Sequence, residues 1–390
     1  MSMHAPAPAH PRRLSTLDRW LPLWIGLAMV AGLVLGRFVP GLSGVLSRLE
    51  VGGISLPIGL GLLVMMYPVL AKVRYDKVGA VARDRRLLVS SLLLNWILGP
   101  LLMFALAWIF LADLPEYRTG LIIVGLARCI AMVVIWNDLA CGDREATAVL
   151  VAVNSVFQVL AFAGMGWFYL TVLPAWLGLD TQGLEVSMAQ IALNVLVFLG
   201  VPLIAGFASR WIGERRRGRA WYEERFLPRI GPWALYGLLF TIALLFALQG
   251  EAIAARPGDV ARIALPLLVY FALMWCAGMG LGRMLGLGYA RSTTLAFTAA
   301  GNNFELAIAV AIGTFGAASG QALAGVVGPL IEVPVLVGLV YVSLRLARSW
   351  FGTDPSATTA ATTSKAGAAA SEVPSAPPAS SLAAEESRTS

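Results

Sequence analysis

Long apolar stretches, each near the length of a membrane crossing, recur along this 390-residue chain and alternate with short polar segments. They predict membrane-spanning helices, because a helix needs about 20 mostly apolar residues to cross the hydrocarbon layer. The third stretch is the clearest, since it contains no charged residue. The ten predicted spans are 20–36, 54–73, 87–112, 120–141, 146–173, 188–208, 233–250, 261–287, 292–315 and 321–347.

Composition supports this interpretation and removes several classes of function. Hydrophobic residues make up 58% of the chain and charged residues only 13%, against about 25% in an ordinary soluble domain. The net charge of +7 does not indicate a nucleic-acid partner, since basic residues in a membrane protein normally mark topology. The only histidines are His4 and His10, so no histidine-based catalytic or metal site can be assembled. We predict a polytopic membrane protein that is not an enzyme and has no cofactor.

Lysine and arginine in the segments between spans predict the orientation. With the N-terminus in the cytoplasm, the cytoplasmic segments hold 21 basic residues and the opposite side holds 5. This asymmetry favours an even number of spans with both termini cytoplasmic. The densest basic cluster, at 214–219, is interpreted as a topology anchor, with an anionic-lipid site as the alternative.

The basic segment divides the ten spans into five and five, so the second half is inverted relative to the first, as in many secondary transporters. A shift of 174 residues aligns Arg128-Cys129 with Asn302-Asn303 and Gln158 with Glu332. The resulting domain prediction is a disordered N-terminal tail 1–14, repeats at 15–173 and 174–348, a basic cytoplasmic loop 209–229 inside the second repeat, and a disordered C-terminal tail 349–390 rich in Ala, Ser, Thr and Pro.

Polar groups fall in the middle of the fourth and ninth predicted spans. The fourth holds Arg128 and Cys129, and the ninth holds Asn302, Asn303 and Glu305. A charge at membrane depth costs about 2.5–3.5 kcal/mol on the insertion scale. We therefore expect helices four and nine to be broken and to cross, with free backbone groups lining a shared binding site.

Each of these residues also has a purely structural interpretation. Arg128 and Glu305 form a buried ion pair in one alternative, and Asn302 and Asn303 join neighbouring helices in another. Cys129 alone would most simply be a small packing residue. Glu332 precedes Pro334 in the tenth span, which favours either a kink beside a polar cavity or a further ion pair.

Several strings resemble the arsenical-resistance arsenite efflux permeases, a family of the bile acid:sodium symporter superfamily. They are Gly125-Leu-Ala-Arg-Cys129-Ile-Ala-Met-Val, Trp136-Asn-Asp-Leu-Ala-Cys-Gly-Asp143, Leu150-Val-Ala-Val-Asn154-Ser155-Val-Phe-Gln158, Phe297-Thr-Ala-Ala-Gly-Asn302-Asn303-Phe304-Glu305 and Gly328-Pro329-Leu-Ile-Glu332-Val-Pro334. The likeness covers about residues 18–348. It implies ten helices in two inverted five-helix repeats, which is the count obtained from the apolar stretches.

The resemblance implies export of arsenite, and often antimonite, across the prokaryotic inner membrane in exchange for protons. The family's fourth-span cysteine falls on Cys129 and its ninth-span glutamate on Glu305, whereas the resemblance gives no function for Cys141 or Cys276. Arsenite is an uncharged trihydroxide at neutral pH, and a single soft thiolate can bind its arsenic and still release it. Hence the hypothesis that Cys129 ligates arsenite, Glu305 carries the coupling proton, and Asn302, Asn303 and Arg128 shape the site. Second-rank candidates are Asn137, Asn154, Ser155, Gln158 and Glu332.

Two rival functions remain at this point. A sodium-coupled importer of an organic anion would use the same fold, with Arg128 holding a carboxylate and the amides with Glu305 coordinating sodium. An intramembrane enzyme would need paired aspartates, a Ser–His pair or a zinc helix, and the spans contain none of these. Partners beyond arsenite, protons and the lipid bilayer, including an oligomeric partner, have no signature in the sequence.

Overall fold

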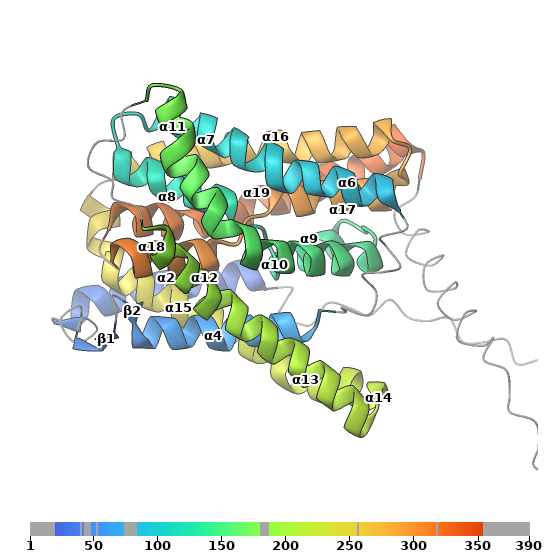
Figure 1. Cartoon of the computed structure of the whole chain (residues 1–390), viewed down its shortest axis with the longest axis horizontal. Coiled ribbons are helices and arrows are strands. Elements are labelled where there is room, and N and C mark those ends of the chain that lie inside the picture. Colours follow the sequence, from blue (N-terminus) through green and yellow to red (C-terminus); the bar gives the residue numbers. More distant parts are fainter. Residues whose placement is uncertain are drawn as a thin grey trace, which may run out of the picture.

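The computed structural model describes residues 20–39, 41–42, 48–51, 54–73, 84–179, 187–255, 257–316 and 319–353. The predicted tail 1–14 and the part of the predicted tail beyond residue 353 lie outside these residues. The described chain is helical apart from one short antiparallel pair, β1 (Glu50–Val51) and β2 (Ile54–Ser55). Figure 1 shows the helices arranged as an elongated bundle.

Each of the ten predicted apolar stretches falls on helix where the structure describes it, and two of them are interrupted. The first five contain α2 (Leu21–Phe38), α4 (Leu56–Ala71), α6 (Arg85–Leu93) joined by a π-helical turn (Leu94–Leu98) to α7 (Gly99–Phe110), α8 (Pro115–Leu126) with α9 (Met132–Leu139), and α10 (Arg144–Trp167) joined by a π-helical turn (Phe168–Val172) to α11 (Leu173–Trp176).

The other five contain α12 (Met188–Val195) joined by a π-helical turn (Leu196–Gly200) to α13 (Val201–Arg217), α14 (Arg219–Trp221) joined by a π-helical turn (Tyr222–Phe226) to α15 (Leu227–Ala255), α16 (Pro257–Met284), α17 (Gly288–Ala300) with α18 (Phe304–Phe315), and α19 (Gly320–Phe351).

The lengths and composition of these helices are those of membrane spans. Within the described residues, six continuous helices are long and apolar enough to cross a bilayer: Arg85–Phe110, Arg144–Trp176, Met188–Arg217, Arg219–Leu248, Pro257–Met284 and Gly320–Phe351. Shorter apolar helices lie at Leu23–Phe38, Leu56–Ala71 and Phe304–Phe315. Large apolar side chains such as Leu160 (77% exposed) and Ile109 (71%) face outward, as they would toward lipid.

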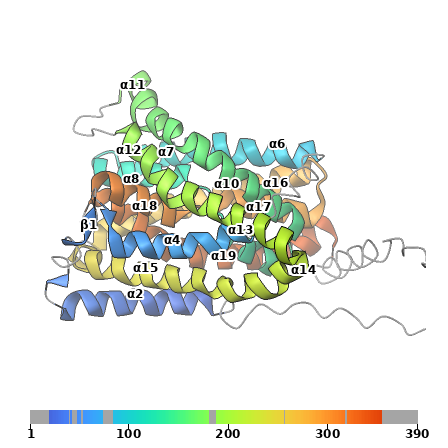
Figure 2. The ribbon, with the colours of Figure 1, turned by 60° about the horizontal axis from the view of Figure 1, so that its bottom comes forward.

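Two groups of helices make up the bundle. In the first, α2 and α4 pack on α15 and α13 packs on α4, and Figure 2 shows α2, α15 and α4 stacked side by side. Gly32 and Gly36 of α2 lie against the carbonyls of Ala243 and Ala247, where a Cβ would come within 2.3 Å of either oxygen. Such small residues four apart allow helix backbones to approach closely in a membrane.

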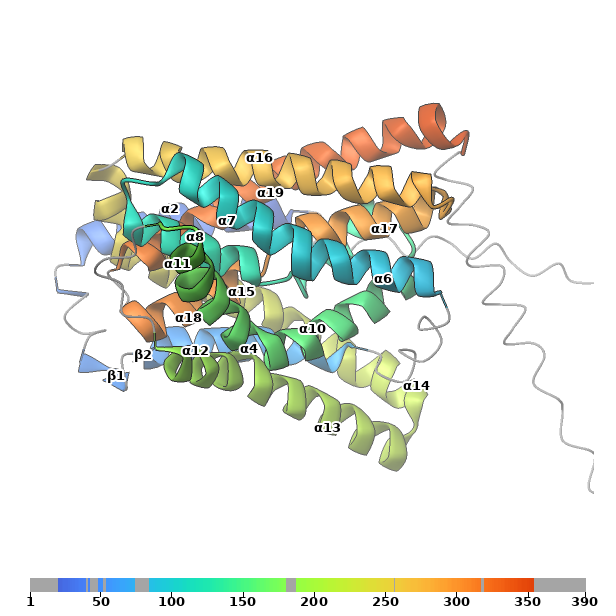
Figure 3. The same ribbon diagram turned by 45° about the horizontal axis from the view of Figure 1, so that its top comes forward.

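In the second group, α7, α8, α16, α17, α18 and α19 pack on one another, and Figure 3 shows α16, α7 and α19 along one side of the molecule. Helix α10 packs on α17 of this group. It also packs on α9 and on α12, and α12 in turn packs on α18. The interrupted helices α8, α17 and α18 therefore belong to the second group, and α18 also packs on α4 of the first group.

Two boundaries predicted from the sequence are wrong. The expected loop 209–229 is helical on both sides of a turn at Gly218, which has a φ of +83°, and α13 and α14 extend from the bundle in Figure 1. Arginine and glutamate are good helix formers, and the (i, i+4) ion pairs Arg210–Glu214 and Arg219–Glu223 extend the helices beyond their apolar parts. Residues 349–351 of the expected C-terminal tail also belong to α19, which ends before the left-handed Gly352.

Candidate functional site

The fourth and ninth predicted spans are each interrupted near the middle of the bundle. Helix α8 ends at Leu126 and α9 begins at Met132, while α17 ends at Ala300 and α18 begins at Phe304. Each interruption begins with extended backbone, at Ala127 and at Gly301. We call residues 127–131 the first break and residues 301–303 the second break.

The two breaks bind each other through their backbones. The Cys129 N–H donates to Gly301 O at 3.3 Å, and the Asn303 N–H donates to Ala127 O at 3.0 Å, as in a short antiparallel bridge. A shift of 174 residues converts one bond into the other, since it carries 127 to 301 and 129 to 303. The peptide groups released by breaking the helices are thus satisfied by the opposite break.

A side chain from the following span completes each break. Gln158 of α10 accepts a hydrogen bond from the Arg128 N–H at 2.5 Å, and Glu332 of α19 accepts one from the Asn302 N–H at 3.3 Å. The same 174-residue shift relates these two bonds as well. Two second-rank candidates from the sequence therefore hold the backbone at the breaks.

Two neighbouring cavities lie beside the breaks. The larger has a volume of about 340 Å³ and extends from Glu305, between α4, α15, α9 and α10, to Lys72 and Asp138 at the far ends of α4 and α9. The smaller, of about 10 Å³, is the size of one water molecule. Both cavities share a set of lining residues: Met65, Val69, Ile130, Ala131, Met132 and Glu305.

The smaller cavity brings four of the five leading candidates together. Cys129, Asn302, Asn303 and Glu305 all line it, opposite Met65 and Met66 of α4. The two methionines are site residues that sequence analysis missed, because an apolar side chain in an apolar span gives no signal of its own.

Cys129 and Asn303 occupy equivalent positions at the starts of α9 and α18. The Val133 N–H donates to Cys129 Sγ at 3.3 Å, and the Leu306 N–H donates to Asn303 Oδ1 at 3.0 Å. Both half-helices thus begin at the site, with the positive ends of their dipoles beside it.

Unpartnered donors also surround the breaks. The side-chain amides of Asn302 and Asn303 are almost fully buried, and their Nδ2 atoms have no hydrogen-bond partner. The Asn302 Oδ1 accepts a hydrogen bond from the Tyr270 hydroxyl at 3.5 Å, so this side chain also reaches the Arg128 side of the breaks. Buried amides are normally paired, so the two unpartnered N–H₂ groups are suited to a bound group with acceptor oxygens.

Arg128 is the leading candidate that the structure does not bring into the cavities. Its side chain is completely buried, and Nη1 donates to the Tyr270 hydroxyl at 2.7 Å while Nη2 donates to Gly125 O. No carboxylate pairs with it among the described residues, so the alternative of an Arg128–Glu305 ion pair is wrong. Tyr270 was missed by sequence analysis, since nothing in a single sequence couples position 270 to position 128.

The two intramembrane carboxyls differ in exposure. Glu305, in the first turn of α18, is partly exposed and lines both cavities. Glu332 is only 2% exposed and is oriented by the Asn302 N–H, and no cationic side chain in the described part of the chain forms an ion pair with it. Helix α19 continues through Pro334, so no break accompanies this carboxyl.

The remaining second-rank candidates lie outside the cavities. Asn154 Oδ1 accepts from Trp96 Nε1 at 3.1 Å, and Ser155 Oγ donates to Val151 O at 2.7 Å. Asn137 Oδ1 accepts from Thr294 Oγ1 at 2.8 Å. These groups join or stabilise helices.

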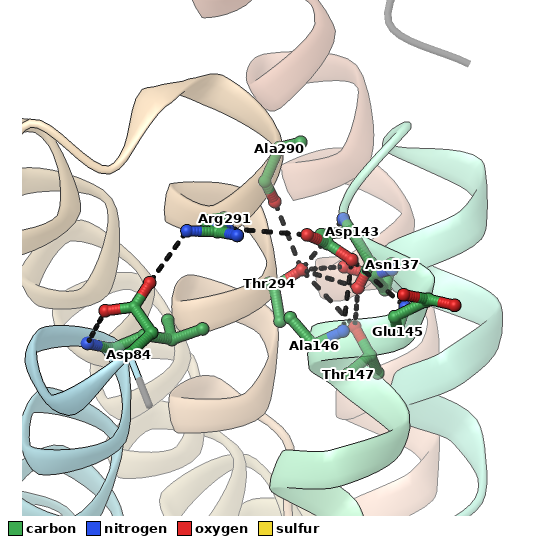
Figure 4. Close-up of polar contacts among 10 residues, drawn as sticks. Asp84, Asn137, Asp143, Glu145, Ala146, Thr147, Ala290, Arg291 and Thr294 are labelled. Atoms are coloured by element: carbon green, nitrogen blue, oxygen red, sulfur yellow. Dashed lines mark hydrogen bonds and ion pairs between the residues drawn. The ribbon is translucent and has the colours of Figure 1, made fainter. Parts of the chain in front are cut away.

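Asn137 belongs to a polar cluster whose hydrogen bonds join α9, α10 and α17 at one end of the molecule (Figure 4). Asp143 caps α10 through the Glu145 and Ala146 N–H groups, and its own N–H donates to Thr294 Oγ1 at 3.0 Å. Arg291 bridges Asp143 to Asp84 at the start of α6. The loop charges at this end thus position the halves α9 and α17 that lead to the breaks.

Comparisons with known proteins identify the family of this chain. Residues 59–256 match the model of the Sodium Bile acid symporter family. The chain is 62% identical to the arsenical-resistance protein Acr3 of Corynebacterium glutamicum over 353 residues, which is 90% of this chain and 95% of that protein. It is 31% identical to Acr3 of Alkaliphilus metalliredigens (86% of this chain, 94% of the relative) and 34% identical to an uncharacterized transporter of Synechocystis (89% and 93%).

Proposed function

The chain belongs to the Sodium Bile acid symporter family and, within it, to the arsenical-resistance transporters, and from this premise we propose that it exports arsenite from the cell in exchange for protons. The relatives named for arsenical resistance support the substrate, and the cavity at the breaks supports the chemistry. Antimonite, which shares the trivalent state and the three hydroxyl groups, is proposed as a second substrate.

The proposal of a neutral substrate rests on the end of the cavities beside the breaks, where no cationic side chain lines them among the described residues. Lys72 is the one basic residue lining either cavity in the described chain, and it lies at the end away from the breaks. An anion moved to the breaks would lose its hydration without gaining a counter-charge. A neutral trihydroxide loses only hydrogen bonds, and these the site can replace.

Cys129 is proposed as the ligand of arsenic. Its thiol replaces one hydroxyl: a sulfur–arsenic bond forms, an arsenic–oxygen bond breaks, and the thiol proton leaves with the hydroxide as water. Neither arsenic nor sulfur changes oxidation state. It is the single cysteine that lines a cavity in the described chain, while Cys141 lies in the α9–α10 turn and Cys276 is exposed on α16. One soft ligand binds arsenic reversibly, as a transport cycle requires.

The paired amides are proposed to bind the two remaining hydroxyl groups. Asn302 and Asn303 both belong to the lining of the cavity that Cys129 lines, their Nδ2 atoms have no hydrogen-bond partner, and a hydroxyl oxygen is a suitable acceptor. These bonds orient the substrate without adding charge. They also give the amides a function that joining helices would not require.

Glu305 is proposed to carry the coupling proton. It lines both cavities, so its carboxyl is reachable from the larger cavity while it lies beside the bound substrate. Glu332 is proposed as a supporting residue that holds the second break through the Asn302 N–H. Arg128 is proposed to support the site from the side of the breaks that faces away from the cavities.

We further propose that the ten helical stretches cross the plasma membrane as two inverted halves, 15–173 and 174–348, with both termini in the cytoplasm. The equivalence of the break contacts under a 174-residue shift supports the repeat. Arg210 of α13 donates to Lys72 O at 3.1 Å, and Arg215, Arg216 and Arg217 follow in the last turn of that helix, so by the positive-inside rule we propose that the Lys72 end of the larger cavity faces the cytoplasm.

Everted membrane vesicles test the function. Arsenite should accumulate when an imposed gradient acidifies the vesicle interior, at the same rate in sodium and in choline media, and a proton carrier should abolish accumulation. A strict requirement for sodium, with uptake of organic anions, would instead support the rival symporter. Vesicles from the same host without the protein provide the background.

A further inference from the structure

The guanidinium of Arg128 occupies a pocket built from three helices. Its Nη2 donates to Gly125 O in the last turn of α8, and its Nη1 donates to the Tyr270 hydroxyl of α16 at 2.7 Å. On α7, a Cβ at Gly99 would lie only 2.7 Å from Nη1, so the absence of a side chain there makes room for the cation.

The partners of this cation are neutral oxygens at the end of a half-helix. Among the described residues Arg128 forms no ion pair, although its side chain is fully buried and a guanidinium keeps its charge in any protein environment. The C-terminal end of a helix carries partial negative charge. In transporters built from broken helices, such carbonyl ends coordinate the coupling cation, and carbonyl and hydroxyl oxygens are ligands that hard cations prefer.

The second break shows what the same position looks like without a cation. Residue 302, equivalent to Arg128 under the 174-residue shift, is asparagine, whose Oδ1 accepts from the Tyr270 hydroxyl at 3.5 Å and whose Nδ2 has no partner. A positive charge is therefore not needed to build a break of this shape. It is present at one break alone, on the side turned away from both cavities.

We propose that Arg128 is a resident cation, which permanently fills at the end of α8 the place where an alkali cation would otherwise bind. The inference rests on the proposed transport function and explains how a member of a family named for sodium symport can couple to protons alone. Its consequence is specific: removing the side chain leaves an empty cation site that added sodium or guanidinium can fill.

The test compares Arg128→Ala, which opens the site, with Arg128→Gln, which removes the charge but leaves the space occupied. Arsenite uptake into everted vesicles is measured in choline, sodium and millimolar guanidinium media at equal ionic strength. Arg128→Ala should transport about tenfold more slowly than wild type in choline, a factor typical of the coupling between an ion site and a substrate site. Sodium or guanidinium should restore most of the lost rate. Arg128→Gln should stay slow in all three media.

Thermal unfolding of the purified full-length variants separates this inference from the transport proposal. Sodium or guanidinium should raise the melting temperature of Arg128→Ala above its value in choline and leave wild type and Arg128→Gln unchanged. This holds even if the wild type proves to carry another substrate. Equal melting temperatures and equal transport of Arg128→Ala in the three media would overturn the inference, as would full activity of Arg128→Gln in choline.

Discussion

The two breaks share one backbone plan and differ in every chemically active side chain. Each gives an N–H to the carbonyl of the other, and each is held by a side chain 30 residues further along, Gln158 or Glu332. The first break contributes a thiol to the cavity and a cation to the opposite side. The second contributes two amides and leads into α18, whose first turn carries Glu305.

This contrast teaches that the architecture of the breaks requires no charge, since neutral glutamine and neutral asparagine serve in it as well as glutamate and arginine. We therefore propose that the thiol and the charged groups at the breaks serve transport rather than folding. We expect substitutions of the active side chains, which differ between the breaks, to change transport. Substitutions of Gln158 and Glu332, which hold the two backbones in the same way, should lower stability equally.

The largest effect is expected from Cys129→Ala, which removes the sulfur from the first break. Arsenite transport should fall by at least about a hundredfold, because a soft centre loses its one soft ligand. The backbone bond from residue 129 to Gly301 O remains, so the protein should reach the membrane in normal amount. Uptake into everted vesicles and quantitative immunoblotting measure the two. Cys276→Ala, on the exposed surface of α16, is the matched control and should transport normally.

Substituting Glu305→Gln should uncouple transport from the pH gradient. A neutral amide cannot take up and release a proton, so uphill accumulation should be lost while binding of arsenite at Cys129 persists. Accumulation under a pH gradient and equilibrium binding to the purified protein separate the two. Gradient-driven accumulation by this variant at the wild-type level would move the coupling group elsewhere, with Glu332 the next to examine.

The breaks were predictable from sequence because their polar residues interrupt two otherwise apolar spans, and the 174-residue shift pairs residues that are in contact in the structure. The side of the breaks toward which the Arg128 side chain points was not predictable. A change of one residue in a non-helical segment turns a side chain to the opposite side, and its partner Tyr270 lies 142 residues away. The helical nature of 209–229 was missed for another reason: apolar periodicity ends where Arg–Glu pairs continue the helix.

A more moderate effect is expected when the structural acceptors are removed. Gln158→Leu and Glu332→Leu each leave a buried N–H unpaired, which costs about 1–3 kcal/mol of unfolding free energy. Glu332→Gln keeps an acceptor like that of Gln158 and should cost less than about 1 kcal/mol. Reversible denaturation in detergent micelles measures all three. Unequal losses for the two leucine variants would break the equivalence of the two halves.

The smallest effect is expected far from both breaks, at the exposed ion pair between Asp113 and Arg262 near the starts of α8 and α16. The hydrogen bond from Arg262 lowers the pKa of Asp113 to about 2. Because this pKa lies below that of the unfolded chain, about 3.9, the pair stabilises the fold at neutral pH, and the contribution is lost as the pH falls from about 4 to about 2.

Asp113→Asn should lower the melting temperature by about 1 °C or less at pH 7, since exposed pairs contribute little. The difference from wild type should shrink below pH 4 and leave arsenite transport unchanged. A transport defect in this variant would mean that groups outside the breaks also carry the chemistry, and the contrast between the breaks would then no longer account for transport alone.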